Sequence, residues 1–124
     1  MTDIPGTNRP PRLSIEQSTA DGIRVVTLSG EIDHTVKDAL SAALLPRDGT
    51  EGAGAPRIVA DLSGVTFMDS SGINVFIDVH KSVSAAQGWL RLAAVREPVL
   101  RIVRLVGLDT VIACHATVEQ ALTP

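Results

Sequence analysis

The clearest change of hydrophobic pattern along the chain lies between residues 58 and 87. Apolar residues crowd the segment 58–62, which is typical of a strand covered on both faces of a sheet. From residue 73 onward the spacing becomes helical, at i, i+3, i+4, i+7 and i+10. This stripe consists of Ile73, Phe76, Ile77, His80 and Val83. The pattern predicts a buried strand, a short loop and a helix whose first turn is Asp69-Ser70-Ser71-Gly72 and which runs to about Gln87.

The N-terminal part of the chain predicts a hairpin followed by a helix. Apolar and polar residues alternate over 13–17, and residues 23–29 form a second strand-like run after the turn signal Asp21-Gly22. Helical spacing begins at His34, and Pro46 ends it. Asp33 is expected at the N-cap or in the first turn, where the helix dipole favours an acid.

The C-terminal part predicts two more strands and two more helices. Residues 89–94 read as a strand, and Glu97-Pro98 opens a helix that Gly107 ends. Val99, Ile102, Val103 and Val106 are expected to face inward, with Arg101 and Arg104 outward. A short strand over 110–114 and a last helical turn or two over 117–122 complete the chain.

The predicted element order is β-β-α-β-α-β-α-β-α, which indicates an α/β domain. We expect a mixed sheet of about five strands packed with about four helices, parallel except for the opening hairpin. Residues 13–124 are assigned to this single domain, and residues 1–12 to a flexible tail rich in Pro, Gly and Thr. Residues 46–56 are rich in Gly, Ala and Pro and are expected to form a mobile surface loop. They are not a nucleotide-binding loop, because the required lysine is missing.

Composition narrows the possible partners. The chain has 124 residues, is 44% hydrophobic and contains only two Phe and one Trp, so its core is expected to be aliphatic. A net charge of −3 disfavours direct nucleic-acid binding, and no apolar run is long enough for a membrane span. The N-terminus lacks the apolar region of a secretory signal. Cys114 is the single cysteine, so no internal disulfide can form, which suits a reducing cytoplasm.

Three hypotheses compete for Asp69-Ser70-Ser71-Gly72. In the first, the segment merely caps a helix. In the second, it is a regulatory phosphoacceptor, because a phosphate brings about −1.5 to −2 charges and would convert a binding face without unfolding the domain. In the third, Ser70 is a hydrolase nucleophile, which requires a base among His34, His80 and His115. The third is disfavoured because Met68 stands where the nucleophile elbow has its first glycine.

Other polar residues give weaker signals. Glu31 and Asp33 lie two residues apart at a strand–helix junction and are most simply solvated caps, or part of a partner surface if they lie near Ser70. No metal-ligand cluster accompanies them. Cys114 is expected to be a small buried apolar residue.

Two segments carry a family resemblance: Gly30-Glu31-Ile32-Asp33 and the run from Val65 to Ile73, which contains Phe-Met-Asp-Ser-Ser-Gly. They resemble the STAS domain, and within it the SpoIIAA-like bacterial anti-sigma factor antagonists. The resemblance extends from about Leu13 to Leu122. It implies phosphorylation of Ser70, with Ser71 as the second candidate, and a partner-binding surface made of Glu31, Asp33, Asp69, Ser70, Ser71 and Gly72.

The resemblance also implies partners. Members of this type bind an anti-sigma factor that is a serine kinase of the GHKL ATPase type, and so release the sigma factor. Phosphorylation dissociates the complex, and a PP2C-type phosphatase restores it. ATP and Mg²⁺ belong to the kinase, so the chain is expected to need no cofactor and to be no enzyme. The alternative is a non-switching STAS scaffold, or an accessory subunit of a lipid or ABC transport or stressosome complex.

Overall fold

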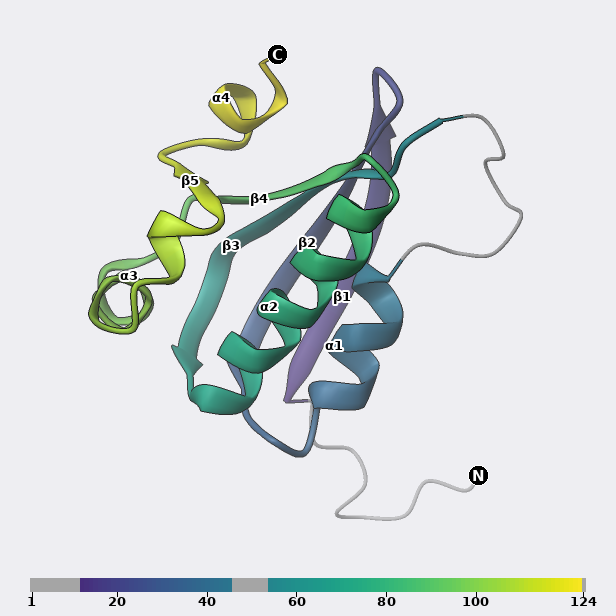
Figure 1. Ribbon diagram of the computed structural model, residues 1–124. Helices are drawn as coiled ribbons and strands as arrows, with labels where there is room; N and C mark the ends of the chain where they lie inside the picture. The colour runs from purple at the N-terminus through teal and green to yellow at the C-terminus, as the bar shows by residue number, and fades with distance from the viewer. Residues whose placement is uncertain (1–11, 46–53, 124) are drawn as a thin grey trace, which may run out of the picture.

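The computed structural model describes residues 12–45 and 54–123, which fold around one five-stranded sheet of order β1-β2-β3-β4-β5 (Figure 1). Strands β1 (Leu13–Ala20) and β2 (Ile23–Ile32) form the antiparallel hairpin. Strands β3 (Arg57–Met68), β4 (Trp89–Ala93) and β5 (Ala113–His115) add in parallel. The predicted α/β class, mixed sheet and element order are therefore confirmed.

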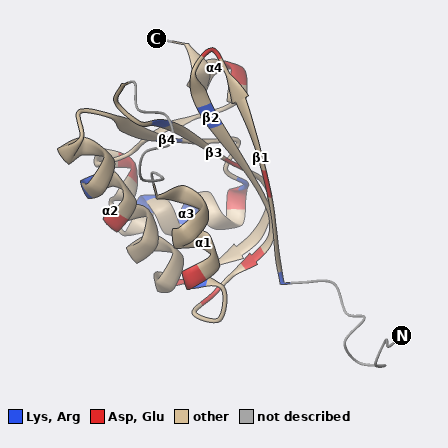
Figure 2. Cartoon of the chain, turned by 90° about the vertical axis from the view of Figure 1, so that its right-hand side faces the viewer, with Lys and Arg blue, Asp and Glu red and all other residues tan. Residues whose placement is uncertain are grey.

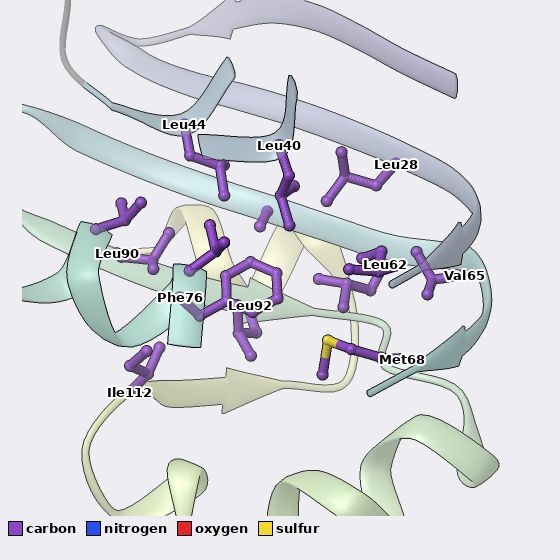
Figure 3. Close-up of a cluster of buried hydrophobic side chains, with 14 of the residues drawn as sticks. Leu28, Leu40, Leu44, Leu62, Val65, Met68, Phe76, Leu90, Leu92 and Ile112 are labelled. Carbon is purple, nitrogen blue, oxygen red and sulfur yellow. The ribbon is translucent and has the colours of Figure 1, made fainter. Parts of the chain in front are cut away.

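Three helices cover one face of the sheet. They are α1 (Lys37–Leu44), α2 (Ser70–Ala85) and α3 (Glu97–Leu105), and Figure 2 shows them together on one side of the strands. The core between them and the sheet is aliphatic except for the fully buried Phe76 and Met68 (Figure 3). Burial of these side chains is the main force that fixes α2 against the strands. The predicted stripe of α2 is largely correct, but Ile77 and His80 lie at its partly exposed margin.

The opposite face of the sheet carries a smaller core. Because side chains alternate along a strand, Val25 and Val59 point away from the main core. They pack with Ala121 of the last helix, α4 (Val118–Leu122). Arg91 donates hydrogen bonds to the Ala121 and Thr123 carbonyls and lies over the Trp89 ring, 3.8 Å from its centroid. In the described part of the chain, three helices thus pack on one face of the sheet and α4 packs on the other.

Three strands are longer than the pattern predicted. Strand β1 runs to Ala20, β2 to Ile32 and β3 to Met68, so the expected loop between β3 and α2 shrinks to Asp69. Strand β4 pairs with β3 only as far as Asp61, and the rest of β3 is held by β2 through a register with two shifts. Such bulges break the alternation of apolar and polar residues, which is why the sequence pattern missed this half of β3.

The observed bounds of other helices and strands differ from the predicted ones where the chain turns. Helix α1 begins at Lys37 rather than His34, with Val36 and not Asp33 at its N-cap. The final strand is Ala113–His115 rather than 110–114, because residues 108–110 form the 3₁₀ turn η1. Val106 is 57% exposed and not inward-facing, since α3 ends at Leu105. Gly107 does follow α3 in the left-handed conformation, with φ of 78°, as predicted. The tail over residues 1–11 and the loop core over 46–53 lie outside the described residues.

Candidate functional site

The site is built where β2 and β3 end side by side. Ile32 and Met68 are register partners at the carboxyl ends of these parallel strands. The Asp69 amide donates a 3.1 Å hydrogen bond to the Ile32 carbonyl, which extends the pairing one residue beyond the strands. The segment after β2, which contains Asp33, and the segment after β3, which contains Ser70, are therefore neighbours. Glu31 and Asp33 were expected to form a shared surface with Ser70 if they lay near it. The structure meets this condition.

Asp69 is the N-cap of α2. Its backbone is extended, and its Oδ1 accepts a 2.8 Å hydrogen bond from the Ser71 amide. The Gly72 and Ile73 amides donate to the Asp69 carbonyl at 3.1 and 3.4 Å. The side chain of Asp69 thus satisfies one of the free N–H groups of the first turn, and its charge faces the positive end of the helix dipole.

Replacement of Asp69 by Ala is expected to lower the free energy of unfolding by about 1 kcal/mol, because the Ser71 amide loses its acceptor. Asp69→Asn retains an acceptor oxygen and should recover most of that loss. Urea denaturation of both variants measures the difference. Equal stability of Asp69→Ala and the unsubstituted protein would contradict the capping role.

Gly72 is required by a close approach of α2 to the strand ends. A Cβ at this position would lie 2.6 Å from Met68 Cγ and 2.7 Å from both Met68 Sδ and Ile32 Cγ2. Gly72 is buried beneath the exposed residues of the site. The prediction that it forms part of the partner-binding surface therefore does not agree with its position. Its lack of a side chain lets the first turn of α2 sit directly on the ends of β2 and β3.

The two serines of the segment differ in exposure. Ser70 is exposed at the first helical position, whereas Ser71 is only partly exposed. No hydrogen bond joins Ser70 to a histidine within residues 12–45 and 54–123. The arrangement that a hydrolase nucleophile needs is therefore not found in this part of the chain.

The acidic residues at the end of β2 and just after it are held by Arg12 and, for Asp33, by local hydrogen bonds. Asp33 Oδ1 accepts from the Thr35 hydroxyl at 2.5 Å and from the Thr35 amide at 3.0 Å. Arg12 Nη1 lies 2.9 Å from Glu31 Oε1 and 3.5 Å from Asp33 Oδ2. The hydrogen bond from the Thr35 hydroxyl has the largest effect on the pKa of Asp33, and it lowers that pKa. Burial has the next largest effect and opposes it, but the Thr35 amide, Arg12 and His34 add to the lowering, so the pKa stays below its ordinary value. Asp33 is thus a fixed carboxylate at neutral pH.

The sequence of this chain is similar to those of known proteins. The STAS domain profile matches residues 14–121. The chain belongs to the STAS domain family. An anti-sigma F factor antagonist of Paenibacillus polymyxa is 30% identical over 111 residues, which cover 90% of this chain and 93% of the relative.

Solved structures agree with this assignment. An anti-sigma factor antagonist of Mycobacterium paratuberculosis superposes with a TM-score of 0.74 at 30% identity, covering 89% of this chain and 91% of the other chain. SpoIIAA, a Bacillus cell fate determinant, has the same fold in its unphosphorylated and phosphorylated forms. The unphosphorylated form has a TM-score of 0.66 at 24% identity, and the superposition covers 88% of this chain and 93% of SpoIIAA. The phosphorylated form has a TM-score of 0.60 at 23% identity, with 88% and 96% covered.

The structure of this STAS domain adds one residue to the expected surface. Phe67 is 46% exposed and is the register partner of Glu31, three residues before Ser70. The sequence pattern missed it because the bulges in β3 turn an apolar position toward solvent. Within the described residues, no helix is both long and apolar enough to cross a membrane.

Proposed function

We propose that this STAS domain is an anti-sigma factor antagonist whose partner binding is switched off by phosphorylation of Ser70. The supporting observation is the position of Ser70, exposed at the N-terminus of α2 and next to the β2–α1 turn. Relatives at 30% identity are anti-sigma factor antagonists, which supports the same role here. Ser71 is the second candidate acceptor, disfavoured by its lower exposure.

Unphosphorylated protein would bind through a surface made of Glu31, Asp33, Asp69, Ser70 and Ser71, with Gly72 beneath it. A phosphate on Ser70 is tolerated by the protein itself, because the helix dipole and the free amides of the first turn favour an anion. The same phosphate adds about −1.5 to −2 charges beside Asp69 and Asp33, which a partner fitted to the neutral hydroxyl must then desolvate. The switch therefore acts on the surface and not on folding.

The proposed partners are those that the resemblance to anti-sigma factor antagonists implies. The chain supplies the acceptor hydroxyl, and the phosphoryl donor is held by the partner. By the resemblance, this partner is an anti-sigma factor that is a serine kinase of the GHKL ATPase type. A PP2C-type phosphatase would restore the hydroxyl. ATP and Mg²⁺ are assigned to the kinase, so the protein itself needs no cofactor and acts as a non-enzymatic regulator. Such an exchange takes place in the cytoplasm.

The second candidate function is a scaffold or an accessory subunit of a transport or stressosome complex, in which Ser70 only begins the helix. Affinity purification with Ser70→Ala and Ser70→Asp baits in parallel separates the two. The switch predicts an ATP-binding anti-sigma factor with the Ala bait and its loss with the Asp bait. Recovery of the same transporter subunits with both baits would favour the scaffold.

Phe67 is expected to anchor the partner. Burying the exposed half of a phenyl ring stabilises a complex by about 1–2 kcal/mol, so Phe67→Ala should raise the Kd for the anti-sigma factor roughly tenfold. Val111→Ala is the matched control, since Val111 is 52% exposed but lies beyond α3. Isothermal titration calorimetry measures both. Equal Kd values for the two variants would exclude Phe67 from the interface.

A further inference from the structure

Arg12 stands immediately before β1 and crosses the end of β2. Its carbonyl accepts a 2.9 Å hydrogen bond from the Glu31 amide, which extends the β1–β2 pairing by one residue. Gly30 permits this close crossing. Its φ is 118°, and a Cβ at this position would overlap the Arg12 carbonyl oxygen. The backbone therefore places the Arg12 side chain beside the surface proposed for partner binding.

The guanidinium of Arg12 contacts two acids of that surface. Arg12 Nη1 lies 2.9 Å from Glu31 Oε1 and 3.5 Å from Asp33 Oδ2. Asp33 Oδ1 already accepts two hydrogen bonds from Thr35, and the Asp33 side chain is only 18% exposed. Asp33 Oδ2 is thus the oxygen that remains for a partner, and Arg12 lies beside it.

The contact of Arg12 with these acids can be opened without disturbing the fold. The side chains of Arg12 and Glu31 are both about half exposed, and water and salt screen an ion pair between exposed groups. While the contact is closed, however, the guanidinium cancels part of the negative charge of the surface and covers Glu31 Oε1. A partner gains the two carboxylates only after Arg12 has moved away.

We propose that Arg12 is an internal competitor of the partner. Its guanidinium masks Glu31 and Asp33 in the free protein and leaves them when the anti-sigma factor binds. This inference rests on the proposed function, because it requires binding at the Ser70 surface. The mask lowers the affinity of the unphosphorylated protein. Since a phosphate on Ser70 adds its own penalty, a complex weakened in this way dissociates more completely on phosphorylation.

The contact itself is tested in the free protein, by an NMR pH titration of the carboxyl carbons. In Arg12→Gln the pKa of Asp33 should rise, because Arg12 is one of the groups that hold it below its ordinary value. Arg101→Gln, which removes an exposed arginine of α3, is the matched control and should leave that pKa unchanged. An equal pKa of Asp33 in Arg12→Gln and the unsubstituted protein would overturn the mask.

Calorimetric titration with the anti-sigma factor measures the competition. Arg12→Gln should lower the Kd about two- to fivefold, the range expected when an exposed ion pair no longer competes. Arg101→Gln should not change it. In a protein that already carries Glu31→Gln and Asp33→Asn, the further change Arg12→Gln should have no effect, because no carboxylate remains to be masked. An unchanged Kd in Arg12→Gln alone, or a raised one, which would mean that Arg12 contacts the partner, overturns the proposal.

Ser70→Asp, titrated in parallel, separates this proposal from the proposed function. If Ser70→Asp loses binding while Arg12→Gln gains none, the mask is overturned and the phosphorylation switch stands. If Ser70→Asp binds as tightly as the unsubstituted protein, the proposed surface is wrong and the mask is overturned with it. Loss of binding in Ser70→Asp together with a lowered Kd in Arg12→Gln is the result that both proposals predict.

Discussion

Ser70→Asp is expected to weaken binding to the anti-sigma factor at least about 100-fold, which corresponds to about 2.7 kcal/mol. The substitution places a permanent carboxylate at the first residue of α2, beside Asp69 and next to the turn that holds Asp33. A partner surface that accommodates a neutral hydroxyl would have to desolvate this extra charge without a matching cation. Ser70→Ala keeps the surface neutral and should bind within about threefold of the unsubstituted protein.

The matched control is Ser82→Asp, which adds the same charge at an exposed position farther along α2. It should leave the Kd unchanged. Thermal unfolding provides a second control, because an acid in the first turn of a helix stabilises it by about 0.3–1 kcal/mol. Ser70→Asp should therefore be at least as stable as the unsubstituted protein. Loss of binding accompanied by unfolding, or an equal loss in Ser82→Asp, would contradict a local electrostatic switch.

Gly72→Val is expected to lower the free energy of unfolding by about 3 kcal/mol, because the new side chain overpacks a filled space. Its Cβ alone would lie 2.6–2.7 Å from atoms of Met68 and Ile32, far inside van der Waals contact. Relief requires the first turn of α2 to move off the strand ends. That movement displaces Ser70, so partner binding should fall as well. Chemical denaturation and calorimetric titration measure the two effects.

A double-mutant cycle tests whether the contact with Met68 is the reason that a side chain at position 72 destabilises the protein. Met68→Ala shortens the side chain that the new Cβ meets, so Gly72→Ala should cost less in that background than alone, by about 1 kcal/mol. Ser71→Ala, at the adjacent position, should change stability little. Additive costs of Gly72→Ala and Met68→Ala would show that the close approach is not what requires glycine.

The sequence pattern predicted the element order well, because the burial of apolar side chains is the main influence on where these helices and strands form. Alternating or helically spaced apolar residues mark β1, β2, α2 and β4, and tertiary packing reinforces each of them. The errors lie where a backbone hydrogen bond or a bulge overrides the pattern. The far half of β3 belongs to the sheet through shifted pairing with β2, and Asp33 uses its carboxylate on the Thr35 turn instead of on the end of α1.

The candidate site was predictable in part. A helix start within Asp69-Ser70-Ser71-Gly72 follows from the sequence, but the pattern leaves open whether Asp69 or a serine is the cap. The proximity of Asp33 depends on the parallel pairing of two strands that are more than twenty residues apart in the sequence, which periodicity does not encode. The exposure of Phe67 depends on the bulges. The burial of Gly72 depends on the side chains of Ile32 and Met68, so it becomes visible only in three dimensions.

The most direct test of the switch is phosphorylation of the purified protein by its anti-sigma factor with ATP and Mg²⁺. Phosphopeptide mapping and size-exclusion chromatography would be applied to the same sample. The expected result is one phosphate on Ser70, none on the Ser70→Ala variant, and separation of the phosphorylated protein from the kinase. A phosphate on Ser71 alone, or a complex that persists after stoichiometric phosphorylation of Ser70, would contradict the proposed switch.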